Sequence, residues 1–445
     1  MSKSYGHILA NPVGSGKTRT ILSAFSRLEG LKGLIVVGPK RVIRDTWPKE
    51  IEIFPNIQID GDCFLYTYQE LVRDVDEIIE RIERLPEFRW TLVIDEIHLV
   101  KNPKTLRSKA ITKLRKKCHF VWGMTGTPCD TRPMDLFGIS EVIGSPISPS
   151  KNAFTKEYCE SKEIPIYSGY SRYPKYYMHV PTAFTKEGYE KLKSWFDLNL
   201  TRRPPDESLI PTPIYAPPYM VDMTKSQSNN YDEVLKGKFH HREGGVETHN
   251  SMLVELIRLR QVTSGVSEKD GGAKTLALFE DILPQLADRK VIVYSPFVDT
   301  LKFLHSKCPY KSMILVGGTS DREAEHNLKT FREDGSCQVL FISDCAATGL
   351  NLQVASALLI YDRPDGYSKL LQLTGRVVRR GQKHHAFIQE IRCKNTVEDW
   401  LTQLLDRKEE MMSCINALGE GDIEQLRSRL RGKSDGNRSK KNRSK

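Results

Sequence analysis

The feature that most constrains the fold of this chain is a glycine-containing loop near its start, Asn11-Pro-Val-Gly-Ser-Gly-Lys-Thr18. It follows a short apolar run at 7–10 and precedes a stretch in which Ile21, Leu22 and Phe25 recur on one helical face. In a strand–loop–helix unit of this kind, backbone N–H groups turn onto phosphate oxygens, the lysine reaches the β/γ-phosphates, and the next hydroxyl ligates Mg²⁺. The residues predicted to bind ATP are Gly14, Ser15, Gly16, Lys17 and Thr18, with Thr18 also a predicted Mg²⁺ ligand.

Asn11 stands where the first glycine of such a loop is usual, so the loop alone could be a Gly-Ser-Gly turn that caps a helix. A pair of carboxylates supports the nucleotide-site interpretation. Residues 91–94 are β-branched or apolar and predict a buried strand, which ends at Asp95 and Glu96. Open α/β sheets bind ligands at this end of their strands. Asp95 is therefore a predicted Mg²⁺ ligand, and Glu96 is predicted to orient or deprotonate the attacking water.

A third motif lies far along the chain, at 372–382, and reads QLTGRVVRRGQ. Its Arg376 and Arg379 can stabilise the charge that develops on a γ-phosphate, although arginines on a helix are also ordinary surface charges. If these arginines lie on a second domain, hydrolysis depends on domain closure. A chain of this kind is a motor.

Apolar runs alternate with amphipathic stretches twice, and this predicts an α/β fold with two tandem, doubly wound parallel sheets and a cleft between them. The predicted strands of the first sheet are 7–10, 33–37, 63–66, 91–94 and 119–124. Those of the second are 291–294, 312–316, 337–342, 357–361 and 386–392. The predicted domains are a first lobe at 1–150, a helical lobe-edge and linker segment at 151–270, a second lobe at 271–430, and a disordered basic tail at 431–445.

Composition agrees with two domains, because 445 residues exceed the size of one ordinary core. No apolar run approaches the ~20 residues of a membrane span, and the start of the chain lacks the apolar core of a signal peptide. Nine cysteines with no C-x-x-C pair indicate reduced thiols and an intracellular protein, cytoplasmic in a bacterium or a bacterial virus, with a nuclear location as the other option.

The formal charge of +11 suggests a polyanionic partner, but much of it lies in the tail. Residues 431–445 hold seven Lys or Arg and one Asp and have no apolar residue, so we expect this tail to be disordered. It is a candidate nucleic-acid arm, a solubilising end, or a localisation signal.

With these motifs in order, the chain resembles superfamily-two helicases, and within them the Swi/Snf-type DNA-translocating ATPases. The resemblance covers roughly residues 8–405 and implies two RecA-like lobes. Besides the phosphate loop (motif I), the matching segments of the first lobe are 37–50 (motif Ia), 66–70 (Ib), 95–102 (II) and 125–128 (III). The central and second-lobe segments are 201–203 and 221–227 with Tyr231, then 291–297 (IV), 372–382 (VI) and 396–399.

Three positions depart from the Swi/Snf-type pattern. Motif V, at 343–351, is nearer to the general superfamily-two form, and Val378 replaces a usual histidine of motif VI. Only ten residues precede Asn11, so a glutamine motif that reads adenine is missing from this sequence, and we expect ATP to be preferred only weakly over GTP.

The resemblance implies roles for further residues. Gln372 orients the γ-phosphate. His98, Thr125 and Thr127 couple the nucleotide side to the nucleic-acid side. The implied nucleic-acid contacts are Lys40, Arg41, Thr67, Tyr68, Gly318, Ser343 and Asn351. An aromatic and basic cluster at 170–177 either stacks on bases or packs within the lobe.

Three functions follow as hypotheses. The first is a nucleic-acid-stimulated ATPase that uses ATP and Mg²⁺ to translocate on duplex DNA. The second is a strand-separating DNA or RNA helicase, which the form of motif V favours. The third is an NTP-gated interaction protein with little turnover, against which the complete set of Lys17, Glu96 and the distal arginines argues.

Overall fold

The computed structural model describes residues 5–402 except 13, 31, 55–56, 58–61, 127–132, 167–175, 204–210, 242–245, 249–251, 345–351, 379–381, 383 and 400. The chain forms two compact units, which are described in turn: unit one includes Met1–Pro205, and unit two is Asp206–Arg407. Among the described residues, no helix combines the length and apolarity that a membrane crossing requires.

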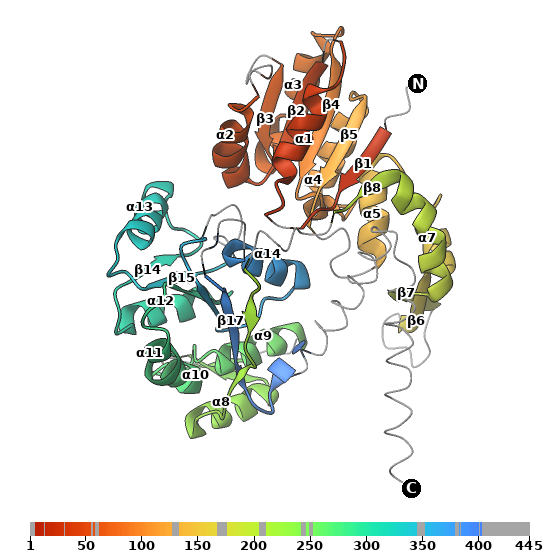
Figure 1. Cartoon of the computed structure of the whole chain (residues 1–445). Helices are drawn as coiled ribbons and strands as arrows, with labels where there is room; N and C mark the ends of the chain where they lie inside the picture. Colours follow the sequence, from red (N-terminus) through yellow and green to blue (C-terminus); the bar gives the residue numbers. More distant parts are fainter. Residues whose placement is uncertain are drawn as a thin grey trace. The chain divides into compact units, whose positions relative to one another are not determined.

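Unit one contains a six-stranded sheet in the order β3-β2-β4-β5-β1-β8, and every pair in it is parallel (Figure 1). Its strands are β1 Tyr5–Leu9, β2 Lys32–Gly38, β3 Cys63–Thr67, β4 Arg89–Asp95, β5 Phe120–Met124 and β8 Leu200–Thr201. The five strands predicted for the first lobe are therefore confirmed to within two residues at either end.

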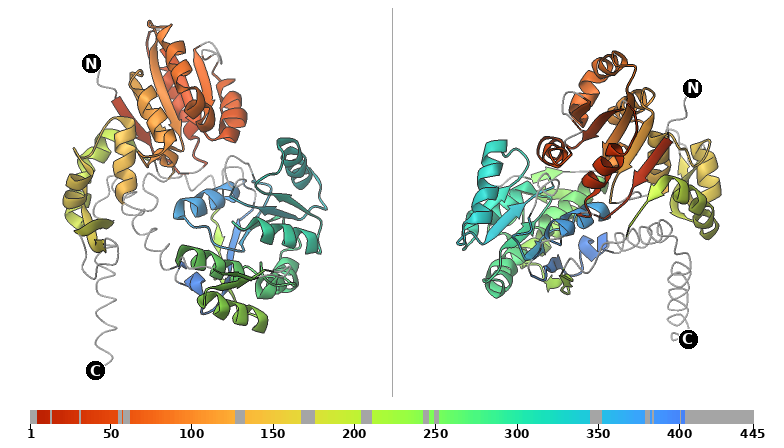
Figure 2. Two further views of the ribbon diagram at one scale, coloured as in Figure 1. Left: turned by 180° about the vertical axis from the view of Figure 1, so that it is seen from behind. Right: turned by 45° about the horizontal axis from the view of Figure 1, so that its top comes forward.

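Helices cover both faces of this sheet. On one face α1 and α2 pack over apolar side chains of β2 and β4, including Leu34, Val36 and Val93. Figure 2 shows α3 and α4 on the opposite face. The helices of this unit are α1 Lys17–Ser26, α2 Trp47–Ile51, α3 Tyr68–Glu83, α4 Leu106–Arg115, α5 Pro133–Ile143, α6 Lys151–Tyr158 and α7 Lys186–Asn199. A hairpin, β6 Cys159–Ile166 with β7 Tyr176–Phe184, follows α6.

The strand register brings the motifs of unit one to one edge of the sheet. Leu9 of β1 and Asp95 of β4 are both in register with Met124 of β5, which lies between them. The chain leaves these three strands at the same level, so the phosphate loop, Glu96 and Thr125 begin side by side. Motifs Ia and Ib start at this level too, because β2 pairs with both β3 and β4 up to their ends.

Unit two contains a second parallel sheet in the order β10-β17-β16-β13-β15-β14, with β9 also paired to β17. Its strands are β9 Ile214–Tyr215, β10 Tyr219–Val221, β13 Val291–Tyr294, β14 Ser312–Leu315, β15 Val339–Ile342, β16 Ala357–Ile360 and β17 Phe387–Cys393. The five strands predicted for the second lobe are confirmed, and with them the α/β class and the two parallel sheets.

Alternating side chains of β13 divide the core of unit two into two layers. Ile292 and Tyr294 face a layer that includes Phe331 of α13 and Leu373 of α14. Val291 and Val293 face the other layer, which α10 and α12 cover. The helices are α8 Lys225–Leu235, α9 Met252–Thr263, α10 Gly272–Leu276, α11 Leu283–Gln285, α12 Val298–Lys307, α13 Asp321–Glu333 and α14 Tyr367–Val377. A short hairpin pairs β11 Lys238–His240 with β12 Val246–Thr248.

The structure differs from the sequence prediction in 151–270. This segment is shared between the two units, and it supplies strands as well as helices. β8 extends the sheet of unit one, whereas β9 and β10 extend that of unit two. These strands have two or three residues each, too few to show a period, and Pro217-Pro218 separates β9 from β10. The basic tail at 431–445 and most of the 170–177 cluster lie outside the described residues.

Candidate active site

The phosphate loop of unit one begins where β1 ends and finishes at the first turn of α1. Gly14 and Gly16 have φ of 80° and 79°, a left-handed conformation that glycine adopts without strain. A Cβ built on Gly16 would meet no atom within 4 Å, so its positive φ, and not crowding, is what favours glycine there. The Nζ of Lys17 donates to the carbonyl oxygens of Asn11 and Pro12, both at 3.1 Å, and so folds back over its own loop.

Asp95 ends β4 and is held from two sides. Its Oδ2 accepts a hydrogen bond from Nε1 of Trp47 at 2.9 Å, and its backbone oxygen accepts one from the hydroxyl of Tyr68 at 2.8 Å. At the end of β2, a Cβ on Gly38 would lie 3.0 Å from the Cβ of Asp95, so the missing side chain leaves this carboxyl its space. Asp95 is thereby fixed next to the phosphate loop.

Electrostatics at Asp95 favour a cation. Burial and the neighbouring charge of Glu96 raise the pKa of Asp95 to about 6, while the Trp47 hydrogen bond and the charge of Lys17 act in the opposite direction. A buried carboxylate with a second carboxylate beside it is costly when both are ionised. A divalent cation at this position would remove that cost, so the donor set fits the predicted Mg²⁺.

Glu96 has a backbone conformation that non-glycine residues rarely adopt, with φ 54° and ψ 54°. Its Oε2 lies 3.3 Å from Nδ1 of His98, and the same nitrogen lies 3.2 Å from Oγ1 of Thr125. Thr125 is fully buried and donates its backbone N–H to the oxygen of Leu9 at 3.1 Å. Glu96, the predicted base, therefore contacts His98, which contacts Thr125, and Thr125 is hydrogen-bonded to β1. His98 and Thr125 are two of the predicted coupling residues. Thr127 lies outside the described residues.

In unit two, the motif at 372–382 begins on α14. Gln372 is buried and Arg376 is partly exposed; they are four residues apart and so lie on one side of this helix. Arg379, the second predicted arginine, lies outside the described residues.

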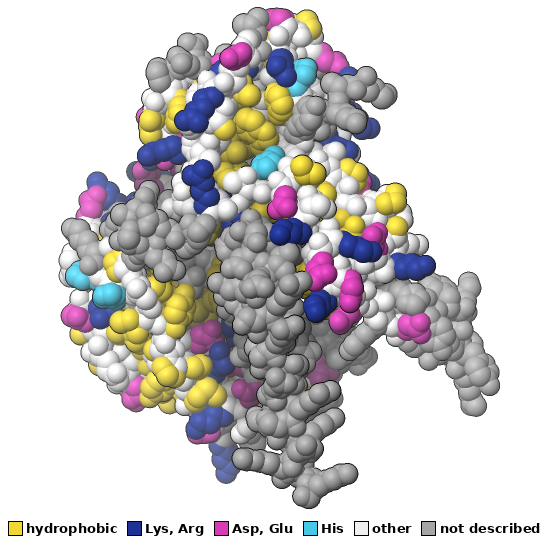
Figure 3. Space-filling view, turned by 45° about the vertical axis from the view of Figure 1, so that its right-hand side comes forward, with side chains coloured by type: hydrophobic (Ala, Val, Ile, Leu, Met, Phe, Trp, Pro, Cys, Tyr) yellow, Lys and Arg dark blue, Asp and Glu magenta, His cyan; other side chains and the backbone are white. Residues whose placement is uncertain are grey.

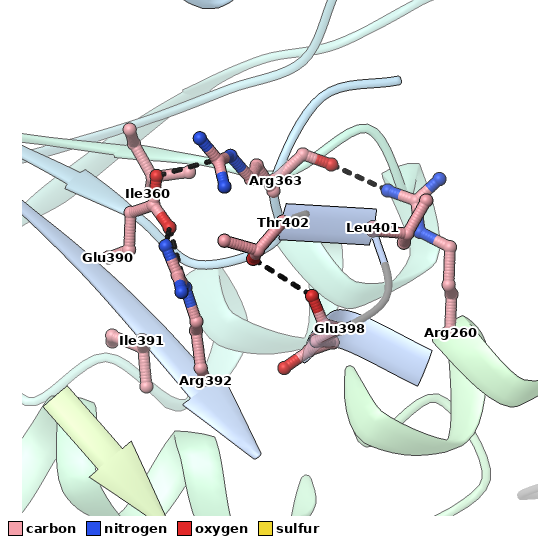
Figure 4. A pocket seen from close by; sticks show the side chains of 9 residues that line it. All are labelled: Arg260, Ile360, Arg363, Glu390, Ile391, Arg392, Glu398, Leu401 and Thr402. Atoms are coloured by element: carbon pink, nitrogen blue, oxygen red, sulfur yellow. Dashed lines mark hydrogen bonds and ion pairs between the residues drawn. The ribbon is translucent and has the colours of Figure 1, made fainter. Parts of the chain in front are cut away.

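A residue that sequence reasoning missed holds the loop before α14. Arg260 of α9 donates from Nη2 to the carbonyl oxygen of Arg363 at 2.6 Å (Figure 4). Arg260 also forms an ion pair with Asp365. The cavity beside it, also lined by Glu390 and Arg392, measures about 10 Å³. That volume admits a single water molecule, so Arg260 has a structural role here. No pattern in the sequence distinguishes Arg260 from its neighbour Arg258 on the same helix.

The predicted nucleic-acid contacts differ in their surroundings. Lys40 is exposed after β2, and Nη1 of Arg41 is buried without a hydrogen-bond partner among the described residues. In unit two, Gly318 is exposed with φ 92° and open space around it, and Ser343 follows β15. Asn351 lies outside the described residues. On the face shown in Figure 3, basic and acidic side chains are interspersed.

Two of these predicted contacts have structural tasks. The Thr67 hydroxyl accepts from the N–H of Glu70 at 3.2 Å in a capping box that begins α3. Tyr68 is 2% exposed, and its hydroxyl is bonded to Asp95. Because it is buried, the side chain of Tyr68 is not favourably placed for the predicted contact with nucleic acid.

Comparison with known proteins agrees with this arrangement. Residues 1–267, more than half of the chain, match the model of the SNF2-related domain, and residues 274–381 match that of the helicase conserved C-terminal domain. A SWI/SNF-related matrix-associated actin-dependent regulator of chromatin subfamily A-like protein 1 homolog from Caenorhabditis elegans is 22% identical over 92% of this chain and 59% of its own length.

Two bacterial relatives show the same extent of similarity. An uncharacterized ATP-dependent helicase from Mycoplasma pneumoniae is 24% identical over 92% of this chain and 40% of its own length. The putative ATP-dependent helicase/translocase YwqA from Bacillus subtilis is 22% identical over 92% of this chain and 46% of its own length. The chain therefore spans between 40% and 59% of the length of these relatives. The match of the family model to most of its length shows that the chain belongs to the SNF2-related family.

Proposed function

We propose that this chain is an ATP-driven motor that translocates on duplex DNA. The observation that carries the proposal is the common level of the strand ends in unit one, where Leu9, Met124 and Asp95 are in register. It supports a single nucleotide site built from the phosphate loop, the acidic pair and Thr125. Membership of the SNF2-related family implies ATP as the nucleotide.

Each group at this edge has a task in the proposed reaction. The N–H groups of Gly14, Ser15 and Gly16 donate to phosphate oxygens, and Lys17 exchanges its two carbonyl acceptors for the β/γ-phosphates. Thr18 and Asp95 hold Mg²⁺, which neutralises phosphate charge when it is bound.

Glu96 takes the proton of the attacking water. Its carboxylate lies 3.3 Å from Nδ1 of His98, and the same nitrogen contacts Thr125. Gln372, Arg376 and Arg379 are assigned to the γ-phosphate, as the sequence predicts, where each arginine would stabilise developing charge.

Duplex DNA is the proposed polymer, bound mainly through its phosphates because a motor must accept any sequence. Nη1 of Arg41, which has no hydrogen-bond partner among the described residues, suits a phosphate oxygen. Gly318 has space for close approach of a phosphate to its backbone. Lys40, Ser343 and Asn351 complete the proposed contacts, with Thr67 contributing through its backbone. His98, Thr125 and Thr127 are the proposed couplers between the two ligands.

Steady-state ATPase measured at fixed low salt tests the proposal, first without nucleic acid and then with duplex DNA, single-stranded DNA and RNA. We expect the strongest stimulation from duplex DNA. A Lys17→Ala variant is the control for contaminating ATPase. Equal rates with and without every polymer would overturn the proposal and favour the NTP-gated interaction protein.

A second candidate is a strand-separating helicase, because two of the relatives carry that word in their names. Assays with a forked duplex and with a triplex distinguish the two functions. A translocase displaces the third strand of a triplex while leaving the fork paired. Unwinding of the fork, with stimulation by single strands, would favour the helicase.

A further inference from the structure

A two-residue strand fastens the end of unit one to the start of the phosphate loop. β8, Leu200–Thr201, pairs with the end of β1, and the oxygen of Thr201 accepts a hydrogen bond from the N–H of Ala10 at 2.8 Å. Arg202 follows, and its Nη1 donates to the oxygen of Ala10 at 2.9 Å. The N–H of Arg203 then donates to Oδ1 of Asn11 at 2.8 Å. Arg202 therefore binds the last residue before the loop, and Arg203 binds its first residue.

Asn11 stands between the catalytic lysine and the exit from unit one. Its side chain is bonded to Arg203, its backbone oxygen accepts from Lys17 at 3.1 Å, and it is 5% exposed. Pro204 and Pro205 follow in the sequence, and unit one ends there. One buried residue thus contacts both the group that must move to bind phosphate and the segment that continues into unit two.

We propose that Asn11 is a positioning residue that transmits nucleotide occupancy from Lys17 to the segment joining the two units. This inference rests on the proposed function. When Lys17 turns to the phosphates of ATP, the Asn11 carbonyl loses its donor and the residue is less restrained. The Asn11–Arg203 hydrogen bond then opens more often in the ATP state.

The chemistry of Asn11 explains why this position differs from the usual glycine. Glycine offers no side-chain acceptor to the N–H of Arg203, so a glycine loop would lack the contact. Asparagine supplies a neutral acceptor, which adds no negative charge near the phosphates. The Asn11→Gly substitution makes the loop more like the usual motif, yet it should impair the motor.

The first experiment measures the ratio of ATPase turnover with duplex DNA to turnover without it, in the full chain. We expect Asn11→Gly and Asn11→Leu to lower this ratio about fivefold to tenfold, the effect of one lost buried hydrogen bond. Arg203→Ala is the matched control, because it keeps the backbone donor and should retain the ratio. Wild-type ratios in both Asn11 variants would overturn the inference.

The second experiment measures the Asn11–Arg203 hydrogen bond by hydrogen exchange and does not depend on ATP turnover. Proline has no amide, so a short peptide such as 200–205 carries exchangeable amides only before Pro204, and the amide of Arg203 is one of the few that it reports. In the wild type, ATPγS with Mg²⁺ should speed this exchange. In Asn11→Gly, exchange should be fast from the start and insensitive to the nucleotide, whereas Asn11→Asp, which keeps the acceptor, should restore slow exchange.

The two experiments separate failure of the inference from failure of the proposed function. If duplex DNA does not stimulate the wild type, the proposed function fails and hydrogen exchange alone decides the role of Asn11. Exchange at Arg203 that is the same in wild type and Asn11→Gly would overturn the inference. Thermal melting of each variant identifies any that fails to fold, and Asn11→Asp then provides the comparison.

Discussion

The two units differ in how their buried charged side chains are balanced by neighbouring charges. In unit one, Asp95 and Glu96 are adjacent carboxylates, and burial raises the pKa of Asp95 to about 6. In unit two, Lys274 is fully buried, yet it contacts the carboxylate of Glu398, Oδ1 of Asp362 at 3.1 Å and the oxygen of Tyr361 at 2.9 Å. Burial alone would lower the pKa of Lys274, but the charges of Glu398 and Asp362 raise it.

The comparison distinguishes buried charges that need a ligand, as in unit one, from buried charges that stabilise the fold, as in unit two. The Lys274 network is satisfied within the protein: Asp362 Oδ2 also accepts from Ser264 and Ser295, both at 2.6 Å. The carboxylates of unit one have no such complete network among the described residues, because the charge of Lys17 offsets the cost of ionising Asp95 only in part. Substitutions should therefore damage activity in unit one and stability in unit two.

The largest expected effect is on turnover in unit one. Glu96→Gln removes the proposed base but keeps the shape of the side chain, so kcat should fall about 10²–10⁴-fold while nucleotide still binds. Single-turnover hydrolysis and binding of a fluorescent ATP analogue measure the two quantities. Near wild-type hydrolysis in this variant would show that Glu96 is not the base.

The largest expected effect on stability is in unit two. Lys274→Met leaves Asp362 and Glu398 as buried carboxylates without their cation, and this should cost about 3–5 kcal/mol. Hydrogen exchange over β13 and β16 measures the loss, and β2 provides the comparison within the same molecule. Lys311→Met is the matched control, because Lys311 pairs with Asp334 at the surface and its removal should change little. Equal effects from the two substitutions would contradict the comparison.

Removing the charge of Asp95 in unit one is expected to stabilise the protein, whereas removing that of Lys274 should destabilise it. A carboxyl with a raised pKa binds its proton more tightly in the folded state than in the unfolded state, so stability falls as pH rises from about 4 to about 6. Asp95→Asn removes this penalty and should stabilise metal-free protein at pH 7 by about 1–3 kcal/mol, while abolishing Mg²⁺-dependent hydrolysis. Urea unfolding in EDTA at pH 4.5 and pH 7 tests it. A less stable variant at pH 7 would mean that the site is satisfied without a cation.

The smallest expected effect is at Thr67, where substitution distinguishes a helix-capping role from a direct contact with nucleic acid. Thr67→Ala should destabilise α3 by about 1 kcal/mol through loss of the cap, and Thr67→Ser should restore it. Thermal melting measures this, with DNA affinity determined in parallel. If the hydroxyl only caps the helix, both variants bind duplex DNA like the wild type; weaker binding by Thr67→Ala at unchanged stability would show a direct contact.

Much of the fold was predictable from sequence because long buried strands leave a strong apolar signal. The runs at 33–37 and 291–294 became β2 and β13. The positions of the phosphate loop after β1 and of the acidic pair at the end of β4 were also predictable, because an apolar run precedes each of them. Both motifs begin at the same level at one edge of the sheet because of the strand register, and this register could not be predicted from the sequence.

What sequence missed depends on contacts between distant residues. Nothing local indicates that the short β8 pairs with β1, or that Lys274 meets Glu398 more than a hundred positions later. Tyr68 illustrates the reverse case. A tyrosine after a strand suits a surface contact, yet the structure turns its hydroxyl inward to the backbone of Asp95.

The shared level of the strand ends in unit one has a consequence for where the chain tolerates added length. One residue inserted within β4 would shift Asp95 by about 3.3 Å and turn it to the other face of the sheet. The turns at the opposite edge, such as 84–88 and 116–119, precede the strands and do not set this level. Insertions should therefore be accepted at those turns, which makes them suitable sites for affinity tags or fluorescent labels.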